Sequence, residues 1–590
     1  MRFLCFLCAG VAMQFCSAAS AGESCAPGDG FCRLMRGWAL LEAGEHKTAK
    51  PEFMAALSLS EGRNFAGEAR LGAAMSDFLR GDYREALPQF QRIYGRDPYN
   101  IGLASYLAAE CFFRQGKYPS ALIYIRQSLL HDSQNPSAQR LQAEISEKLG
   151  QPVEAYQAYG TLRQFDPGDR EIAGEMSSLA KKLKGRPADY MYYTRIKLPL
   201  PHGPRSVKSP EVRMAYFAGR GGAAAELSSV EFISASTFTV EGGGMKLILP
   251  PVKSWTLSWN PARKAMDIRD NWGETVISGA DKVAMRHFPD NPENCLLLKN
   301  AVSSRADIDL SDRELRGEIL FSAGENGFLS GGSVRLEDLL PGLLSSAAQG
   351  TPPETLKALA VALRSEIRDR HYEFCDSPAC AVYRGANTES PRVMAAVDAT
   401  TGEVLVSSPP GAAFAADFHS VCGGETDYGV KDSTSVIADL TLRVFSAPPA
   451  DLLCAPEDQT RWAQAKWSVL LDTSEISRRL GRDIGKFRGV EIIKRNQYGR
   501  ALSAKFTGSK GEAAVDGADN ISYALSAGTL RSPLYIIIPL EKGKKLLVRG
   551  IGTGNGGGLC IEGAKAMANS GADYKTILQK YFPGNVTIKE

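Results

Sequence analysis

The chain has 590 residues, of which 44% are hydrophobic and 23% are charged, so it can form about three or four globular domains with sizeable cores. Its formal net charge is only +3, and this near balance argues against nucleic acid as a partner. The 58 glycines indicate that part of the chain is loop-rich β structure.

The N-terminus has the three parts of a secretory signal peptide. Arg2 precedes an apolar stretch over residues 3–15, and small residues follow up to Ala21, so residues 1–21 are predicted to be removed. The residues before Cys16 are not the small ones of a lipoprotein signal, which argues against a lipid anchor. No later segment approaches the roughly 18 apolar residues that cross a bilayer. We therefore expect an exported protein, periplasmic or associated with the cell wall, whose mature form has no membrane span.

Twelve cysteines are present, and nine remain after cleavage at residue 21. Export permits disulfides, and Cys25 and Cys32 could close a small loop at the mature N-terminus. An odd number leaves one thiol outside the disulfides or engaged with a metal. Cys111 lies in a helical pattern and is interpreted as a buried, small apolar residue.

Residues 22–185 carry a helical repeat. Three segments place a glycine in a turn and an alanine five residues later, at spacings of 35 and 34 residues. These spacings are typical of a tetratricopeptide repeat, in which the glycine makes the turn and the alanine lets two antiparallel helices approach. The three pairs, and a degenerate copy that precedes them, are Gly81 with Ala86, Gly116 with Ala121, Gly150 with Ala155, and Gly44 with Ala49.

A stack of such repeats presents a concave surface, which we interpret as a binding site for a partner protein or peptide. The alternative is a spacer or dimer scaffold without a ligand of its own. Nothing in the repeat sequence identifies the partner.

A linker is predicted at residues 186–208, after which the helical period gives way to short alternating segments separated by glycine-rich turns. Helical patterns follow at 336–344 and at 353–367, where Pro-Pro-Glu is a start signal. Strands return from Val393, and a helix is predicted within 460–480. The fold class is therefore an all-α tetratricopeptide-like solenoid followed by a mixed α+β domain over residues 209–590. The predicted strands are 211–217, 236–240, 245–249, 254–259, 315–321, 490–494 and 534–539.

A glycine-rich loop near the C-terminus leads into an amphipathic helix that ends at Pro583-Gly584. Asn555 lies in the middle of this flexible backbone, which is how a site presents amide groups and one side chain to a ligand. The alternative is a loop at the rim of a barrel. A phosphate-binding loop is excluded, because no Gly-Lys-Ser/Thr ending follows. The glycines are at 550, 552, 554, 556, 557 and 558.

Two further segments bring histidine and cysteine together: His371, Cys375 and Cys380 in the first, and His419 and Cys422 in the second. These side chains are enough for a tetrahedral zinc site, with zinc as the candidate cofactor. A disulfide between Cys375 and Cys380 is the alternative in an exported protein. Cysteine catalysis, with Cys422 or Cys560 as the thiolate and His419 as its base, is disfavoured, because the sequence shows no third group to orient the imidazole.

Several blocks in order resemble the stage II sporulation protein D and amidase enhancer family, and the resemblance extends from about residue 209 to the C-terminus. It implies a peptidoglycan-acting protein outside the cytoplasmic membrane, either a lytic transglycosylase or a stimulator of a cell-wall amidase. The blocks are VRLEDLLPGLL, ETLKALAVALRSE, FCDSPACAVYRG, AAVDATTGEVLV, FHSVCGGET and GIGTGNGGGLC.

The resemblance also implies where a catalytic acid would lie. The transglycosylase reaction needs one carboxylic acid to protonate the glycosidic oxygen and then deprotonate the muramyl hydroxyl that closes the anhydro ring. The family's glutamate matches Ala347 or Ala348 here, and no carboxylate lies between Asp338 and Glu354. Glu354 is the fallback acid, although a carboxylate in the first turn of a helix is also favoured by the helix dipole.

Two more positions depart from the family: Asn555 stands where its glycine-flanked histidine is, and Cys422 where it has a serine. Asparagine can hydrogen-bond a sugar but cannot shuttle a proton. We therefore expect a catalytically impaired protein that binds glycan strands and enhances or scaffolds cell-wall hydrolases, with the repeats recruiting a hydrolase or another protein. The predicted glycan-binding residues are His419, Cys422, Gly423, Gly424, Gly554, Asn555 and Gly556, and the predicted metal ligands are His371, Cys375, Cys380 and Cys422.

Two alternatives stay open. One is an active lytic transglycosylase that uses a displaced acid such as Glu354 or Glu425. The other is an assembly scaffold without glycan binding.

Overall fold

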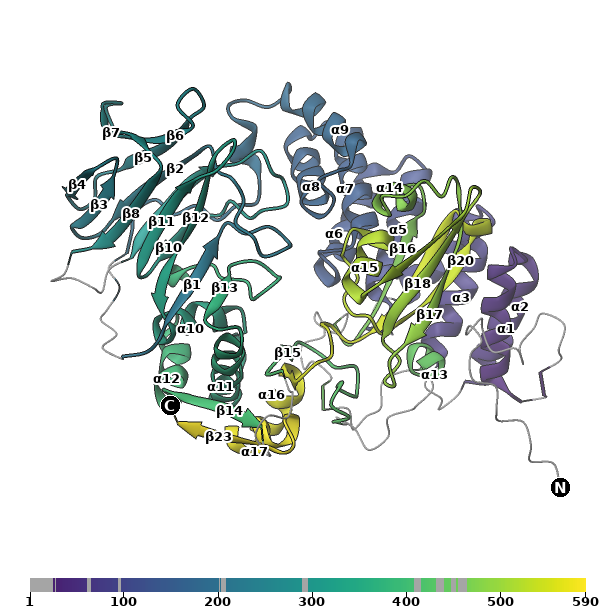
Figure 1. Cartoon of the computed structure of the whole chain (residues 1–590). Helices are drawn as coiled ribbons and strands as arrows, with labels where there is room; N and C mark the ends of the chain where they lie inside the picture. Colours follow the sequence, from purple (N-terminus) through teal and green to yellow (C-terminus); the bar gives the residue numbers. More distant parts are fainter. Residues whose placement is uncertain are drawn as a thin grey trace. The chain divides into compact units, whose positions relative to one another are not determined.

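A computed structural model describes residues 25–589 except 27, 61–64, 94–96, 201, 203–207, 289–294, 348, 408–414, 431–439, 447–452 and 455–463. The predicted signal peptide, residues 1–21, lies outside the described residues. The chain forms two compact units (Figure 1). The first comprises Met1–Phe165, Arg170–Tyr190 and His419–Gly563, and the second comprises Asp166–Asp169, Met191–Phe418 and Ala564–Glu590.

The first unit begins with consecutive helices that confirm the predicted solenoid. The predicted turn glycines at 44, 81, 116 and 150 all have positive φ, which favours glycine there. The alanines five residues later are fully buried, because neighbouring helices pack across them. A disulfide joins Cys25, which precedes α1, to Cys32 in the first turn of that helix, and Cys111 is buried as expected. The helices are α1 (Gly30–Glu42), α2 (His46–Ser58), α3 (Ala66–Leu79), α4 (Tyr83–Ile93), α5 (Ile101–Arg114), α6 (Tyr118–His131), α7 (Pro136–Lys148), α8 (Pro152–Phe165) and α9 (Arg170–Ala180).

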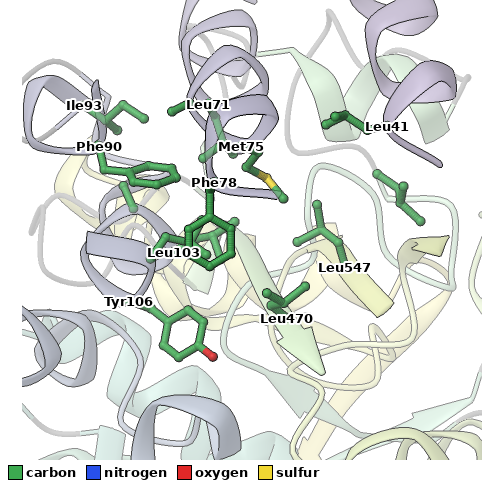
Figure 2. Close-up of a cluster of buried hydrophobic side chains, with 14 of the residues drawn as sticks. Leu41, Leu71, Met75, Phe78, Phe90, Ile93, Leu103, Tyr106, Leu470 and Leu547 are labelled. Carbon is green, nitrogen blue, oxygen red and sulfur yellow. The ribbon is translucent and has the colours of Figure 1, made fainter. Parts of the chain in front are cut away.

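A three-stranded antiparallel sheet from the C-terminal half packs on these helices, in the order β16 (Lys466–Asp472), β21 (Lys545–Ile551), β20 (Tyr535–Leu540). The first helices of the repeats, α1, α3, α5 and α7, all contact it. Figure 2 shows Leu470 of β16 and Leu547 of β21 beside Met75 and Phe78 of α3. The chain's own sheet therefore covers the face that the first helices present.

Both faces of this sheet are buried. Along β16, Leu470 joins the core shared with the repeats, whereas Val469 and Leu471 point into a second core. That second core lies against another three-stranded sheet and helix α15. Burial on both sides explains why these strands carry consecutive apolar residues, such as Val469, Leu470 and Leu471, rather than a strict alternation. The remaining elements of this unit are α13 (Leu440–Phe445), α14 (Ile476–Arg479), β17 (Phe487–Arg495), β18 (Ala501–Gly508), β19 (Glu512–Asp516), α15 (Ala518–Ser526) and β22 (Leu559–Cys560).

A buried carboxylate joins the sheet to the repeats. Glu68 of α3 accepts hydrogen bonds from Lys466 of β16, at 2.5 Å, and from Arg549 of β21. Arg549 also donates to Asn100, at 3.0 Å, and its guanidinium lies 5.5 Å from the ring centroid of Trp38. Burial would raise the pKa of Glu68, but the two cations outweigh it and hold the pKa at about 2.

The second unit contains two packed sheets, and Phe232 of β2 lies 6.0 Å, ring to ring, from Phe238 of β3. Their strand pairs are antiparallel except β1 with β13. The seven-stranded sheet has the order β13 (Glu373–Cys375), β1 (Glu211–Tyr216), β12 (Phe328–Arg335), β11 (Glu318–Ala323), β8 (Lys282–His287), β3 (Phe238–Gly242), β4 (Met245–Leu249). The six-stranded sheet has the order β10 (Arg313–Leu315), β9 (Leu296–Val302), β2 (Ser229–Ser234), β5 (Trp255–Asn260), β6 (Ala265–Arg269), β7 (Thr275–Ala280).

Helices follow these sheets in the second unit. Glu337 of α10 (Leu336–Leu344) and Arg364 of α11 (Pro353–Asp369) form a buried ion pair, with N···O distances of 2.8 and 3.0 Å, that ties the two helices together. β14 (Glu403–Ser407) pairs with β23 (Asn585–Lys589), so the C-terminal strand returns to this unit. None of the described helices is long and apolar enough to cross a bilayer.

Three predicted elements differ from the structure. The strand expected from Val393 is a helix, α12 (Pro391–Ala399), because Ser390 caps its N-terminus and Pro391 suits its first turn. The helix expected within 460–480 is reduced to the four residues of α14, because residues 466–472 of that range form β16. The glycine loop leads into two helices, α16 (Ile561–Asn569) and α17 (Tyr574–Tyr581), since Gly571 turns the chain at a φ of 94°.

The compact units also divide the predicted domain of residues 209–590. Residues 419–563 group with the helical repeats rather than with residues 191–418. The shared apolar core and the buried ion cluster at Glu68 give the physical reason, since neither can form from the repeats or the strands alone.

Replacing Glu68 with alanine should leave Lys466 and Arg549 buried without their carboxylate. We expect the free energy of unfolding to fall by about 3–5 kcal/mol, measured by urea denaturation followed by tryptophan fluorescence. The control is Glu475→Ala, which breaks a half-exposed pair with Arg478 and should cost about 0–1 kcal/mol. Equal, small losses in both variants would show that the ion cluster does not hold the sheet to the repeats.

Candidate functional site

The two loops predicted to bind glycan lie side by side in the first unit. The backbone of Val421 pairs with that of Thr553, with N–H···O distances of 3.1 and 2.8 Å. The second loop follows directly from β21, so the strand that carries Arg549 also sets the position of the glycines. The structure thus brings residues 419–424 and 552–558 together.

Close packing explains why glycine is required in the second loop. A Cβ on Gly554 would lie 2.5 Å from Cβ of His419, and one on Gly556 would lie 2.1 Å from the guanidinium of Arg500. Both glycines also have positive φ, at 106° and 88°. The groups that approach this backbone are therefore side chains of the same chain.

Asn555 is the exposed side chain of the loop. Its Oδ1 accepts a hydrogen bond from the backbone N–H of Gly557 at 3.0 Å, which fixes the carboxamide in a local turn. The Nδ2 group is then the end of the carboxamide that can donate to a ligand oxygen.

Beneath the loops lies a buried cluster of one imidazole and three thiols. The ligand atoms of His419, Cys422 and Cys560 all lie within 4.8 Å of one another. Sγ of Cys454 lies 3.5 Å from Sγ of Cys422. All four residues are at most 4% exposed. The arrangement can hold a metal ion through one nitrogen and three sulfurs.

Hydrogen bonds favour one ionised sulfur in this cluster, that of Cys560. The backbone N–H of Gly424 lies 3.2 Å from Sγ of Cys422, and that of Cys422 lies 3.4 Å from Sγ of Cys560. Burial opposes ionisation, but hydrogen bonds from the neighbouring Cys422 and Cys454 thiols outweigh it and hold the pKa of Cys560 well below its usual value. The Cys422 thiol instead keeps its proton, because burial and its two sulfur neighbours, Cys454 and Cys560, raise its pKa.

The four residues predicted as metal ligands do not form the single site that the sequence suggested. Cys375 and Cys380 form a disulfide with each other, so their sulfurs are not available as thiolate ligands. His371 is exposed in the turn that follows α11. Cys422 instead joins His419, Cys560 and Cys454.

Sequence reasoning weighed Cys560 with His419 only as a thiolate and its base, and it missed Cys454 altogether. Cys560 lies in the same C-terminal block as the glycine loop, which could have linked it to the 419–424 loop. Cys454 lies in a segment without a periodic pattern, so no signal in the sequence placed it.

The predicted catalytic positions lie in the second unit. Ala347 ends a short 3-10 turn, Ser345–Ala347, and Ala348 lies outside the described residues. The fallback acid, Glu354, accepts a hydrogen bond from the backbone N–H of Tyr574 at 2.9 Å and pairs with Lys357 at 2.6 Å. Its carboxylate therefore anchors the start of α17.

A different acid has a pKa close to neutral. Burial raises the pKa of Glu366 on α11 to about 7, with Arg370 opposing the rise and Asp417 adding to it. Its partner Arg370 lies 2.9 Å away. The helical pattern alone gave no reason to select Glu366.

Sequence comparisons find two kinds of relative. The family described as "Stage II sporulation protein" matches residues 325–406, and tetratricopeptide repeat families match residues 34–101 and 77–145. An uncharacterized protein of Brachyspira hyodysenteriae is 25% identical over 288 residues, which cover 47% of this chain and 72% of that protein. The parts are those of a cell-wall-related protein with protein-interaction repeats.

Solved structures similar to part of this chain are tetratricopeptide proteins. YrrB, described as having an unusual peptide-binding site, is 17% identical, with a TM-score of 0.24, over 28% of this chain and 83% of that chain. MamA from Desulfovibrio magneticus RS-1 is 16% identical, with a TM-score of 0.24, over 27% of this chain and 87% of that chain.

Replacing Gly554 with alanine should disturb the site through its contact with His419. Positive φ alone costs about 1–2 kcal/mol, and the overlap with His419 adds to it. Gly481→Ala is the matched control, because Gly481 also has positive φ, at 63°, but faces open space. Urea unfolding should show a larger loss for Gly554→Ala, and equal losses would contradict the close packing.

The carboxyl group of Glu366 should make the free energy of unfolding fall as pH rises. A carboxyl whose pKa is raised from 4.5 to about 7 contributes its full stability below pH 4.5 and loses it as pH rises through 7, about 3 kcal/mol in all. Glu366→Gln should remove this dependence in urea unfolding at pH 4.5 and pH 8. Glu373→Gln, at an exposed carboxylate, is the control. An unchanged pH profile in Glu366→Gln would contradict the assignment.

Proposed function

We propose that this protein is exported, binds peptidoglycan glycan strands, and enhances or scaffolds cell-wall hydrolases without cleaving the strands itself. The observation that carries the proposal is the exposed Asn555, held by its own turn on a loop that packs against residues 419–424. An outward carboxamide can hydrogen-bond a sugar hydroxyl or an acetamido oxygen, whereas it cannot transfer a proton. The match to the sporulation-protein family supports the cell wall as the place of action.

The impaired catalysis in this proposal rests on the acid positions. Alanine stands at the family's glutamate position, at 347 or 348, and Glu354 is committed to Tyr574 and Lys357. Removing Glu354 from its partners would leave the first backbone amide of α17 without an acceptor.

The repeats supply the partner-binding part of the proposal. The chain's own sheet covers the first helices of the repeats, so an external partner needs another face. On α6, Ile123 and Leu130 are 67% and 66% exposed, and their spacing of seven residues places them on one face of the helix. We propose that a hydrolase or another wall protein binds there.

An active lytic transglycosylase is the second candidate, and Glu366 is the observation that favours it. A pKa of about 7 suits an acid that must donate a proton and then accept one near neutral pH. In this candidate the displaced acid is Glu366, whereas Glu354 is held by Tyr574 and Lys357.

Purified full-length protein incubated with amidase-stripped glycan strands separates these functions. Pull-down without release of 1,6-anhydro-muramyl ends, weakened roughly tenfold by Asn555→Ala, supports the proposal, since one lost hydrogen bond is worth about 1.4 kcal/mol. Asn520→Ala, at an exposed asparagine of α15, is the control and should bind as the wild type does.

The other outcomes identify the alternatives. Release of anhydro ends that stops in Glu366→Gln shows the transglycosylase. If the protein neither binds the strands nor releases anhydro ends, it is an assembly scaffold.

A further inference from the structure

We propose that His419, Cys422, Cys454 and Cys560 form a structural zinc site that fixes the two loops to each other. The geometry supports this first. Zinc–sulfur bonds of 2.3 Å in a tetrahedron separate the sulfurs by about 3.8 Å. Sγ of Cys422 and Sγ of Cys454 are 3.5 Å apart, and the ligand atoms of His419, Cys422 and Cys560 lie within 4.8 Å. Small side-chain movements close the four ligands around one ion.

The imidazole is oriented as a ligand. Nδ1 of His419 lies 2.7 Å from the carbonyl oxygen of Gly557 and donates its proton there, so Nε2 carries the lone pair. Nε2 is buried and has no hydrogen-bond partner among the described residues. A buried nitrogen without a partner is costly, and a metal ion would satisfy it.

The surroundings suit the charge of such a site. Three thiolates and Zn²⁺ carry a net charge of −1, which needs compensation in a buried place. Arg443 donates to the carbonyl of Gly423 at 2.6 Å, and Arg500 donates to the carbonyls of Cys422 and Glu425 at 3.2 and 2.8 Å. Both guanidinium groups therefore lie beside the loop that carries Cys422.

The ligand set selects the ion and its role. Three sulfurs and one imidazole favour zinc over magnesium or calcium, which prefer oxygen. Four protein ligands fill a tetrahedron and leave no position for water, so the site is structural rather than catalytic. A disulfide between two of the cysteines would leave the third thiol and Nε2 of His419 unsatisfied.

This site differs from the one predicted at Cys375 and Cys380, and it does not depend on glycan binding. It connects the loop at 419–424, the segment at Cys454 and β22, which follows the glycine loop. Metal binding would thus order the glycine loop before any ligand arrives.

The test measures metal in the full chain purified without chelators. We expect about one zinc per chain by mass spectrometry, falling to below about a tenth in Cys560→Ser and Cys454→Ser. Cys111→Ser is the control, because that thiol is equally buried but lies in α5, and it should retain its zinc.

A second measurement uses the wild-type protein, so it does not depend on whether the variants fold. Replacing zinc with Co²⁺ in the wild type should give the visible bands of a tetrahedral site and thiolate charge-transfer absorption. Removing the metal should expose Cys422, Cys454 and Cys560 to alkylation, whereas Cys111 and Cys295 stay protected by their apolar cores.

Three results would overturn the proposal. They are a metal-free chain in which peptide mapping finds Cys422 disulfide-bonded to Cys454 or Cys560, a cobalt form without thiolate absorption, and full zinc content in both cysteine variants.

Discussion

One buried carboxylate constrains most of the first unit. Glu68 lies in a helix of the repeats, yet both cations that neutralise it, Lys466 and Arg549, come from strands almost four hundred residues or more further along the chain. An isolated buried charge is too costly to persist, so the strands and the repeats must fold as one body. The apolar residues around this cluster, such as Leu470 and Leu547, add the area that makes the association stable.

The position of the candidate site follows from this association. β21 carries Arg549 and ends at Ile551, and the glycine loop begins at the next residue. A strand held by a buried ion pair and two apolar cores gives the loop a fixed origin. The same packing covers the first helices of the repeats, so the surface that a solenoid would offer to a partner is occupied within the chain.

The family-like motifs of the second unit serve its packing as well. Glu337 pairs with Arg364 between α10 and α11, and Glu354 holds the start of α17. These carboxylates are engaged in hydrogen bonds that a reacting group would have to break. Glu366 differs because burial keeps its proton near neutral pH, which is a property of its surroundings rather than of its sequence motif.

The sequence by itself determined the repeats and most of the strands, whereas only the family resemblance placed the two loops at one site. Turn glycines such as Gly81 and buried alanines such as Ala86 act within about thirty residues, so local pattern is sufficient to find them. Only the tertiary structure decided that residues 419–563 belong with the repeats, that Cys375 bonds to Cys380, that Cys560 lies with His419 and Cys422, and that Cys454 lies beside Cys422. These outcomes depend on which distant segments share a core, and a one-dimensional pattern carries no information about that choice.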